Sequence, residues 1–146
     1  MISIYNKSME EYFQTLKRNK LKITPRRKAV IGLFLKSGMR MGPYDIYNKL
    51  KQKLPKIGLP TVYRILDELK KAGILVQSLS SDRQLCYALC DSPGTHHHHF
   101  VCRKCKKVDE VNFCNFKGIS EFIKKNLKAK VETHHLQIEG VCSKCK

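Results

Sequence analysis

Residues 60–89 read PTVYRILDELKKAGILVQSLSSDRQLCYAL, and this stretch decides the fold of the first half of the chain. Its first part has apolar residues at helical spacing, which predicts a helix from Pro60 to Lys71 that ends at Gly73. Two apolar runs follow, 74–76 and 85–89, separated by the polar residues 80–83, and this pattern is typical of a β-hairpin. The apolar face of the predicted helix consists of Val62, Ile65, Leu66 and Leu69.

Further helices are expected upstream of this stretch. Residues 9–16 carry apolar side chains at helical spacing. Thr24 followed by Pro25 is a helix start, with the threonine as N-cap and the proline at the first helical position. Pro43 opens another helix. Three or four helices followed by a hairpin are the pattern of a winged helix-turn-helix domain.

The cysteines divide the chain in two, because residues 1–85 contain none while residues 86–146 contain all seven, together with all six histidines. We therefore expect a winged-helix domain over 1–89, a hinge over 90–95 and a second domain over 96–146. The second domain has the pattern strand, strand, helix, strand, with strands over 99–102, 108–112 and 131–141 and a helical stripe over 116–127. The predicted fold class is α+β: an N-terminal winged helix followed by a small α/β domain.

Lysine and arginine exceed aspartate and glutamate by 17, which favours a polyanionic partner over a merely solvated surface. No apolar run reaches the ~20 residues of a membrane span, and the N-terminus carries acidic residues where a signal peptide would be apolar. The expected location is cytoplasmic, with no membrane partner. Thiols stay reduced there, so paired cysteines indicate metal or redox chemistry.

Double-stranded DNA is the polyanion that the first half would contact. Thr61, Tyr63 and Arg64 lie near the start of the helix over 60–71, the part that enters a major groove in helix-turn-helix proteins. Lys22 and Arg26 flank the start of an earlier helix, where phosphate contacts are expected. The alternative is an ordinary amphipathic surface helix with solvated charges.

Two Cys-Xaa-Xaa-Cys pairs in the second half predict a structural zinc site. Two residues between thiolates let both sulfurs reach one tetrahedral ion at about 2.3 Å. Four sulfurs leave no open position, so we expect one structural Zn²⁺ per chain rather than a redox dithiol. The ligands are Cys102, Cys105, Cys142 and Cys145.

The tract His96–His99 runs directly into a predicted strand, in which alternate side chains face opposite sides. His97 and His99 would therefore face one way, and His96 and His98 the other. One short segment can thus contribute to two separate metal sites.

Four stretches resemble the ferric uptake regulator family in order and spacing: TVYRIL (61–66), HHHHFVCRKC (96–105), VDEV (108–111) and GVCSKC (140–145). The resemblance covers nearly the whole chain. Within the family the chain looks most like the zinc uptake regulator branch, because Cys90 stands where iron-sensing members usually carry a carboxylate. The residues 113–114 also look like that branch.

The resemblance implies a sensor site with the ligands Cys90, His97 and His99, and Glu110 as the candidate fourth ligand. Zinc-sensing relatives use a residue near 76–77 instead, and Cys86 is a further alternative, although a lone thiol in an apolar strand is more often core. A third family site would use His96, His98 and His134; Lys117 stands at its carboxylate position, so Glu121 is the replacement. Cys114 and His135 are interpreted as structural or solvent-facing residues.

The function implied by the resemblance is that of a metal-dependent transcriptional repressor that binds a palindromic operator as a homodimer and has no small-molecule substrate. Thiolate and imidazole suit Zn²⁺ better than Fe²⁺ at a tetrahedral site, with Fe²⁺ or Mn²⁺ as alternative signals. Iron- and peroxide-responsive regulators are the rivals within the family. A zinc-dependent enzyme is a remote alternative, because a catalytic zinc needs an open position and a general base. The chain is not expected to be an enzyme.

Overall fold

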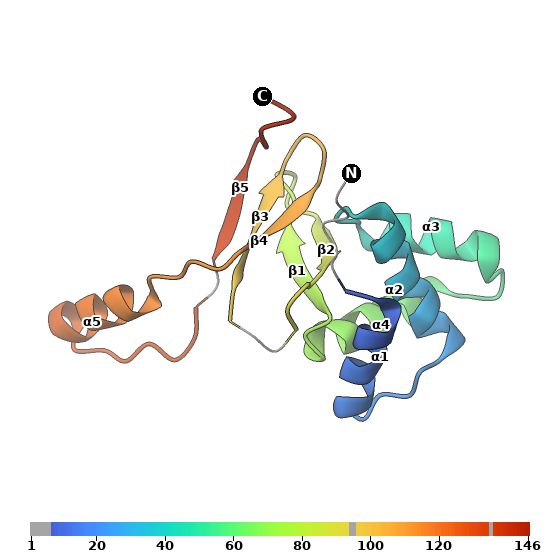
Figure 1. Ribbon diagram of the computed structural model, residues 1–146, viewed down its shortest axis with the longest axis horizontal. Coiled ribbons are helices and arrows are strands. Elements are labelled where there is room, and N and C mark those ends of the chain that lie inside the picture. Colours follow the sequence, from blue (N-terminus) through green and yellow to red (C-terminus); the bar gives the residue numbers. More distant parts are fainter. Residues whose placement is uncertain (1–6, 94–95, 135) are drawn as a thin grey trace.

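The computed structural model describes residues 7–93, 96–134 and 136–146. His135 and the last residues of the predicted hinge, Gly94 and Thr95, lie outside the described residues. The elements, drawn in Figure 1, are α1 (Met9–Arg18), α2 (Pro25–Ser37), α3 (Pro43–Lys53), α4 (Leu59–Lys71), β1 (Leu75–Leu79), β2 (Leu85–Leu89), β3 (His98–Cys102), β4 (Val108–Val111), α5 (Phe116–Leu127) and β5 (Gln137–Gly140).

Helices α1–α4 and the β1–β2 hairpin form the first half around one apolar core. Helix α2 begins as its sequence predicts, since the Thr24 hydroxyl accepts a hydrogen bond from the Arg27 N–H at 3.3 Å and Pro25 follows the cap. It ends at Gly38, whose φ of 62° is accessible to glycine at little cost. The expected apolar face of α4 is buried, and its members are Val62, Ile65, Leu66 and Leu69.

The hairpin pairs Leu75 with Leu89 and Leu79 with Leu85 in antiparallel register. Tyr87 of β2 also bonds to Met41, in the connection between α2 and α3, which seats the hairpin on the helices. The winged helix-turn-helix prediction for the first half is confirmed.

The second half contains a three-stranded sheet in the order β4-β3-β5, with β3 antiparallel to β4 and parallel to β5. The predicted order strand, strand, helix, strand is therefore correct. The length of the last strand was predicted wrongly, because β5 covers only Gln137–Gly140 of the expected 131–141. The strand is short because β5 forms backbone pairs only with residues 99–102 of β3.

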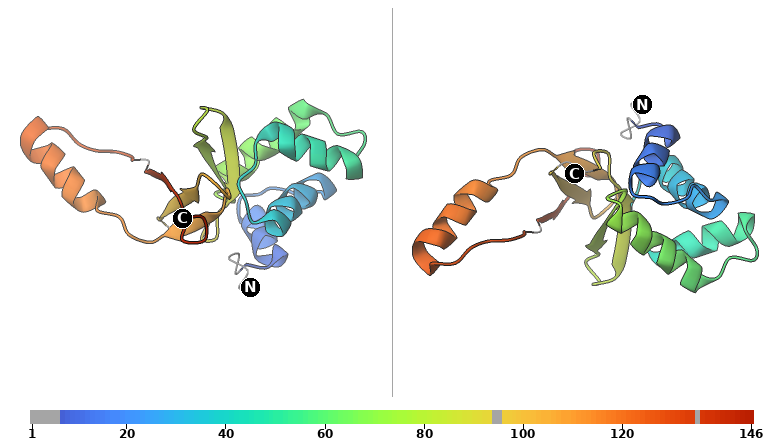
Figure 2. Two further views of the ribbon diagram at one scale, coloured as in Figure 1. Left: turned by 90° about the horizontal axis from the view of Figure 1, so that it is seen from above. Right: turned by 90° about the horizontal axis from the view of Figure 1, so that it is seen from below.

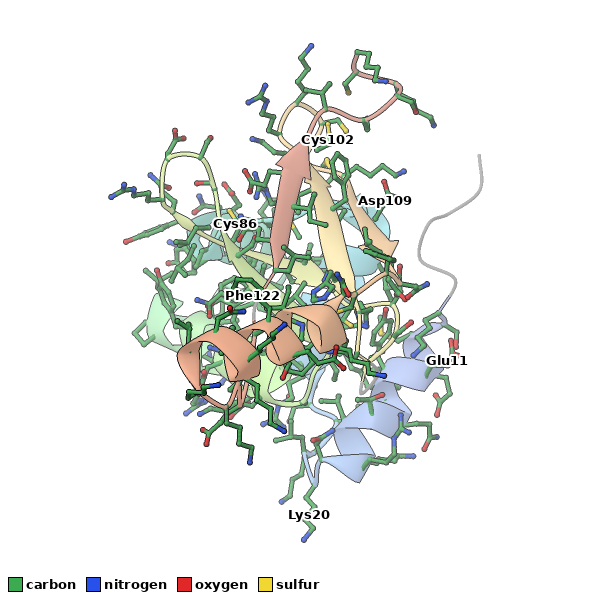
Figure 3. The ribbon with its side chains drawn as sticks, turned by 90° about the vertical axis from the view of Figure 1, so that its left-hand side faces the viewer. Glu11, Lys20, Cys86, Cys102, Asp109 and Phe122 are labelled. Atoms are coloured by element: carbon green, nitrogen blue, oxygen red, sulfur yellow. The ribbon has the colours of Figure 1, made fainter. Side chains whose placement is uncertain are left out.

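Helix α5 lies at the end of an arm that projects away from both sheets (Figures 1 and 2). None of its residues is buried, and Ile119, Phe122 and Leu127 are 54%, 64% and 68% exposed. Figure 3 looks at the molecule from the side on which this helix projects, with Phe122 labelled. The single chain therefore leaves the apolar stripe of α5 without a partner.

The second half has little apolar core of its own. Its buried cluster consists of Val101 and Val108 packed with Ala88 of β2, and Val76 of β1 covers it. The hairpin thus supplies part of the core of the second sheet. A sheet with so few buried side chains needs another source of stability.

Polar contacts also join the two halves. The guanidinium of Arg40, between α2 and α3, forms an ion pair with Glu139 of β5 at 2.8 Å. The side-chain amide of Gln137 bonds to both the N–H and the carbonyl of Leu79, at 3.4 and 2.9 Å. None of the helices in the described part of the chain has the length and apolar character that a bilayer crossing needs.

Candidate metal centres and DNA-contact surface

The four thiols of the Cys-Xaa-Xaa-Cys pairs come together at one end of the second sheet, where Figure 3 labels Cys102. Their sulfurs all lie within 4.8 Å of one another, and the sulfurs of Cys105 and Cys142 are 3.8 Å apart. Zn–S bonds of about 2.3 Å in a tetrahedron give sulfur–sulfur edges of about 3.8 Å. The donor set and the spacing both fit a structural Zn²⁺.

The backbone around these thiols favours the thiolate at one of them. Backbone N–H groups of Cys105 and Cys142 donate to the sulfur of Cys102 and lower the pKa of that thiol to about 6. Hydrogen bonds that hold the Cys145 thiol in its protonated form, shared with the sulfurs of Cys142 and Cys105, raise the pKa of Cys145. Zinc coordination requires deprotonated thiols. The N–H groups around Cys102 are therefore already arranged for a negatively charged sulfur.

A second cluster brings together Cys90, directly after β2, and two imidazoles from the start of the second half. The Cys90 sulfur lies 3.1 Å from Nε2 of His97, which lies 3.2 Å from Nε2 of His99. Tetrahedral edges for zinc with nitrogen and sulfur ligands measure about 3.3–3.6 Å. The three side chains thus face one point that a small cation fits.

Burial shifts Cys90 and His99 towards their neutral forms. Burial raises the pKa of the Cys90 thiol to about 11, and burial followed by the charge of His97 lowers the pKa of His99 to about 4. The buried phenol of Tyr12 in α1 donates to the Cys90 carbonyl at 3.1 Å, which ties this backbone position to the helices of the first half.

Glu110 lies beside this cluster rather than in it. It pairs with His99 across β3 and β4, and its carboxylate accepts hydrogen bonds from the Ser92 hydroxyl at 2.9 and 3.1 Å. Its oxygens are not among the ligand atoms that lie within 4.8 Å of one another. Cys86 on β2 also lies outside the described clusters. A role for Glu110 as fourth ligand remains a prediction.

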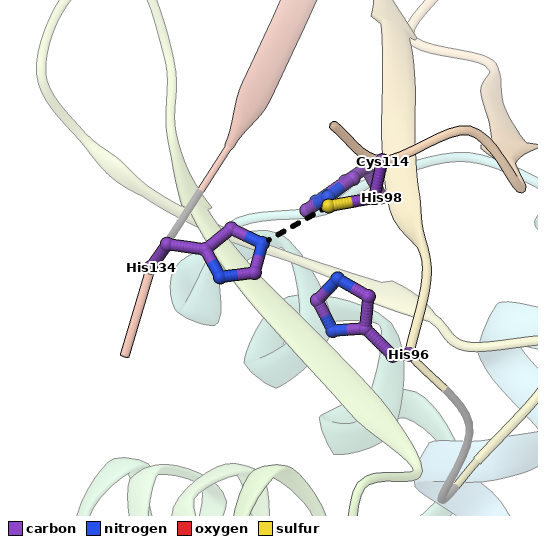
Figure 4. A group of neighbouring side chains, drawn as sticks. All are labelled: His96, His98, Cys114 and His134. Carbon is purple, nitrogen blue, oxygen red and sulfur yellow. Dashed lines mark hydrogen bonds between the residues drawn. The ribbon is translucent and has the colours of Figure 1, made fainter. Parts of the chain in front are cut away.

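The third cluster contains His96, His98 and His134 as expected, but its fourth member is Cys114 (Figure 4). The Cys114 sulfur lies 3.3 Å from Nε2 of His134. Glu121, the residue expected here, is an exposed residue of α5 and does not join the cluster. The interpretation of Cys114 as merely structural or solvent-facing does not fit this geometry.

The two imidazole clusters open onto one cleft of about 390 Å³ between the hairpin and the second sheet. Val76 and Gln77 of β1 form one wall, and the histidine tract forms the other. The alternation expected along the tract agrees with this arrangement, because His97 and His99 go to one cluster while His96 and His98 go to the other.

The proposed DNA-contacting residues lie on the outer face of the first half. Arg26, Thr61 and Arg64 line a single depression between the starts of α2 and α4. Tyr63 is 39% exposed and Lys22 is exposed. The neighbouring Arg27 is instead held by Glu68 at 2.8 Å and by the Lys22 carbonyl at 2.6 Å. Arg26 and Arg64 are thus the better-placed cations for a phosphate.

A sequence model of the Ferric uptake regulator family matches residues 18–139. A "Ferric uptake regulation protein" of Bacillus subtilis is 33% identical over 126 residues, which cover 85% of each chain. The "Peroxide operon regulator" of the same organism is 27% identical over 137 residues, covering 94% of this chain and 92% of its own.

The fold agrees with a solved structure described as a zinc uptake regulator complexed with zinc and DNA. The TM-score is 0.76 at 23% identity, and the match covers 94% of this chain and 91% of the other. At that identity the likeness supports the fold alone. Proteins named as a ferric uptake regulation protein, a peroxide operon regulator and a zinc uptake regulator thus all occur among the similar proteins.

Proposed function

Because the chain belongs to the ferric uptake regulator family, a family of metal-responsive, DNA-binding transcriptional regulators rather than enzymes, we propose that it is a zinc-responsive repressor that binds a palindromic operator as a homodimer in the cytoplasm. The observation that carries the proposal is the approach of Cys90 to His97 at 3.1 Å across residues 90–95. In this proposal residues 1–89 read DNA, 90–95 are the hinge and 96–146 form the dimerisation domain.

Zinc as the signal is supported by the chemistry of the ligands. Thiolate and imidazole are borderline-soft donors that zinc accepts in tetrahedral sites, whereas carboxylate-rich sites suit harder ions. Cys90, His97 and His99 are the ligands in this proposal, and Glu110 is the candidate fourth. A response to Fe²⁺ is the second candidate, favoured by the 33% identity to a ferric uptake regulation protein.

The proposed mechanism follows from where the ligands stand in the chain. Cys90 continues β2 of the DNA-reading half, while His97 directly precedes β3 of the other half and His99 belongs to that strand. A bound cation would supply a bridge between them. With the hinge held, the α4 helices of a dimer keep one separation, and the fraction of molecules that match two operator half-sites rises.

Cys102, Cys105, Cys142 and Cys145 are proposed to hold a second, structural Zn²⁺. The proposal is supported by four sulfurs within 4.8 Å and by the small apolar core of the sheet that they close. The site has no ligand position left for a substrate or a water molecule. Its role is therefore to hold β5 beside β3.

The dimer is proposed to form between the second halves through α5. The exposed stripe formed by Ile119, Phe122 and Leu127 supports this, because an apolar stripe of that size on a projecting helix is buried when two identical copies pair about a twofold axis. The operator contacts are assigned to Thr61, Tyr63 and Arg64 of α4, with Arg26 and Lys22 on phosphates.

Operator binding at buffered free zinc tests the proposal. DNA is first selected from a random-sequence pool with zinc-loaded protein, and binding is then measured for the wild type, Cys90→Ser and the matched control Cys86→Ser. We expect Cys90→Ser to stay dimeric and to keep the zinc of the Cys-Xaa-Xaa-Cys pairs, yet to lose zinc-dependent binding, while Cys86→Ser behaves as the wild type. Tight, zinc-responsive binding by Cys90→Ser would remove Cys90 from the sensor.

The same assay decides between the metals. Fe²⁺ and Mn²⁺ replace Zn²⁺ in parallel titrations under anaerobic conditions. The proposal is supported if Zn²⁺ activates operator binding at a lower free concentration than Fe²⁺ or Mn²⁺ does. If Fe²⁺ alone activates operator binding, the protein is an iron-responsive regulator instead.

A further inference from the structure

We propose that Cys114 joins His96, His98 and His134 in a zinc site of one thiolate and three imidazoles, and that an ion bound there closes the base of the α5 arm. The consequence for the dimer rests on the proposed function, in which α5 is the pairing surface. The ligand set itself does not depend on that function.

The cluster lies where the arm joins the sheet. Cys114 precedes α5 by two residues and His134 follows its last residue by seven, so the two bracket the helix. The Cys114 sulfur and Nε2 of His134 are 3.3 Å apart, and the ring centroids of His96 and His134 are separated by 4.7 Å. One ligand atom from each of the four side chains lies within 4.8 Å of the others. Figure 4 shows the four side chains turned towards one another.

A buried imidazole without a hydrogen-bond partner points independently to a ligand. His98 is 5% exposed, and its Nε2 has no partner among the described residues. A buried polar atom without a partner costs about 1–3 kcal/mol, so native structures rarely keep one unless something else satisfies it. A metal ion held by the neighbouring thiol and imidazoles would satisfy this nitrogen.

The donors select the class of ion. Three imidazoles and a thiolate match tetrahedral Zn²⁺, whereas Mg²⁺, Ca²⁺ and Mn²⁺ prefer carboxylate and carbonyl oxygens. Phe116, the first residue of α5, stacks on the His134 ring with centroids 4.4 Å apart and planes 10° apart. This contact orients the imidazole and ties the start of α5 to the site.

The site would restrain the arm through both of its ends. No residue of α5 is buried, so among the described residues the arm is held chiefly through the segments that connect it to β4 and β5. Coordination by Cys114 and His134 fixes both segments to the histidine tract and shortens the freely moving part of the arm. A partner that binds α5 then has less conformational entropy to overcome, so zinc at this site favours the dimer.

Zinc content under competition with a chelator of known affinity tests the ligand assignment. The variants are Cys114→Ser and His134→Gln, which alter the site from opposite sides of α5, with Cys86→Ser and Glu121→Gln as controls. We expect the two site variants to lose one zinc per chain or to bind it at least about 10-fold more weakly, because even outer-shell changes cost about 10- to 100-fold. Wild-type zinc content and affinity in Cys114→Ser, or a loss in Glu121→Gln instead, would overturn the assignment.

Sedimentation of zinc-loaded protein over a concentration series tests the effect on the arm. Cys114→Ser should dissociate to monomers at higher protein concentration than the wild type does, and hydrogen exchange in α5 should be faster. An unchanged monomer–dimer equilibrium in a variant that has lost the zinc would overturn the coupling.

The sensor variant Cys90→Ser separates this proposal from the preceding one. It should keep the zinc at Cys114, so loss of that zinc in Cys90→Ser counts against an independent site. If the wild type binds no DNA in response to zinc while Cys114→Ser still loses an ion, the proposed function fails and the ligand assignment stands.

Discussion

The thiol of Cys90 is buried and the imidazole of His99 is half-buried, and the loss of solvent disfavours the charged form of each. The pKa of Cys90 is raised to about 11 and that of His99 is lowered to about 4. A divalent cation therefore finds the His99 imidazole neutral and ready to bind, while the Cys90 thiol must lose its proton on binding. The pKa of Asp91, the residue next to Cys90, shifts in the opposite direction to that of His99. Burial, together with the nearby charge of Glu110, raises this pKa to about 6.

These two shifts act against each other in the acid stability of the metal-free protein. His99 titrates near 6.5 when unfolded and near 4 when folded, so its contribution is lost as the pH falls through that window. Asp91 titrates near 3.8 when unfolded and near 6 when folded. Its contribution to the free energy of unfolding is therefore present at low pH and is lost as the pH rises from 3.8 through 6. We predict that Asp91→Asn makes the free energy of unfolding fall more steeply between pH 6.5 and pH 4.

Urea unfolding of chelator-treated protein across this pH range measures how steeply the free energy of unfolding changes with pH in Asp91→Asn and in the wild type. A variant slope equal to or shallower than that of the wild type would contradict the assignment of opposite signs.

The sequence identifies some residues of the sites and misses others for physical reasons. The two Cys-Xaa-Xaa-Cys pairs were recognisable because each is a local motif whose spacing alone fits an ion. The alternation along His96–His99 was predictable from strand geometry. Cys114 was not assigned as a ligand, because it meets His134 only through the path of the arm, 20 residues later. The available signal was a thiol following a predicted strand, with Lys117 at the expected carboxylate position.

At the scale of elements, β5 connects the end of the sheet that carries the four clustered cysteines to the first half. Glu139 of β5 holds the guanidinium of Arg40, whose side chain is 2% exposed, and the Arg40 N–H donates to the carbonyl of Lys106, directly after Cys105, at 3.2 Å. The position of β5 beside β3 therefore affects how the α2–α3 connection is held.

We predict that Glu139→Gln lowers the free energy of unfolding by an intermediate amount. Breaking an exposed ion pair costs about 0.2–1 kcal/mol, and removing one partner of a fully buried pair costs about 3–5 kcal/mol. The loss arises because the Arg40 charge stays buried without a carboxylate, while Glu139 itself is 24% exposed. The double variant Arg40→Met, Glu139→Gln should recover part of it.

Denaturant unfolding of these variants and of Lys71→Gln, which breaks the exposed pair with Asp67, measures the difference. An effect of Glu139→Gln no larger than that of Lys71→Gln would mean that the contact between the halves is as weak as a surface pair.

The helices and the hairpin were predictable because their signals are local: a cap at Thr24, prolines at helix starts and apolar spacing. The extent of β5 was not, because a strand extends only as far as its pairing with a neighbouring strand, and β5 pairs with β3 only at residues 99–102. Local sequence also does not reveal that Arg40 and Glu139 meet, since they are 99 residues apart.

At the scale of the whole molecule, the first half has a large core of its own and the second half does not. The buried cluster of the second sheet contains Val101, Val108 and Ala88. Burying a valine contributes about 1.5–3 kcal/mol, whereas structural Zn²⁺ contributes about 10–16 kcal/mol in zinc-finger peptides. An ion held by the four cysteines would therefore contribute more to the stability of the second half than its small apolar cluster does.

We predict that Cys142→Ser removes this zinc and abolishes slow hydrogen exchange in β3–β5, while amides of α1–α4 keep their protection. Exchange measured by mass spectrometry on proteolytic fragments gives both halves in one experiment, and Cys86→Ser is the control. Protected amides in β3–β5 of zinc-free Cys142→Ser would show that the sheet folds without the metal.

The central claim is that one ion held by Cys90, His97 and His99 fixes the two halves of each chain relative to each other. A crystal structure of the zinc-loaded dimer on its operator, with anomalous differences collected at the zinc edge, tests this most directly. The expected result is a peak about 2.3 Å from the Cys90 sulfur and about 2.0–2.1 Å from Nε2 of His97 and of His99. A DNA-bound dimer in which that sulfur points away from both rings, with no peak between them, would contradict the account.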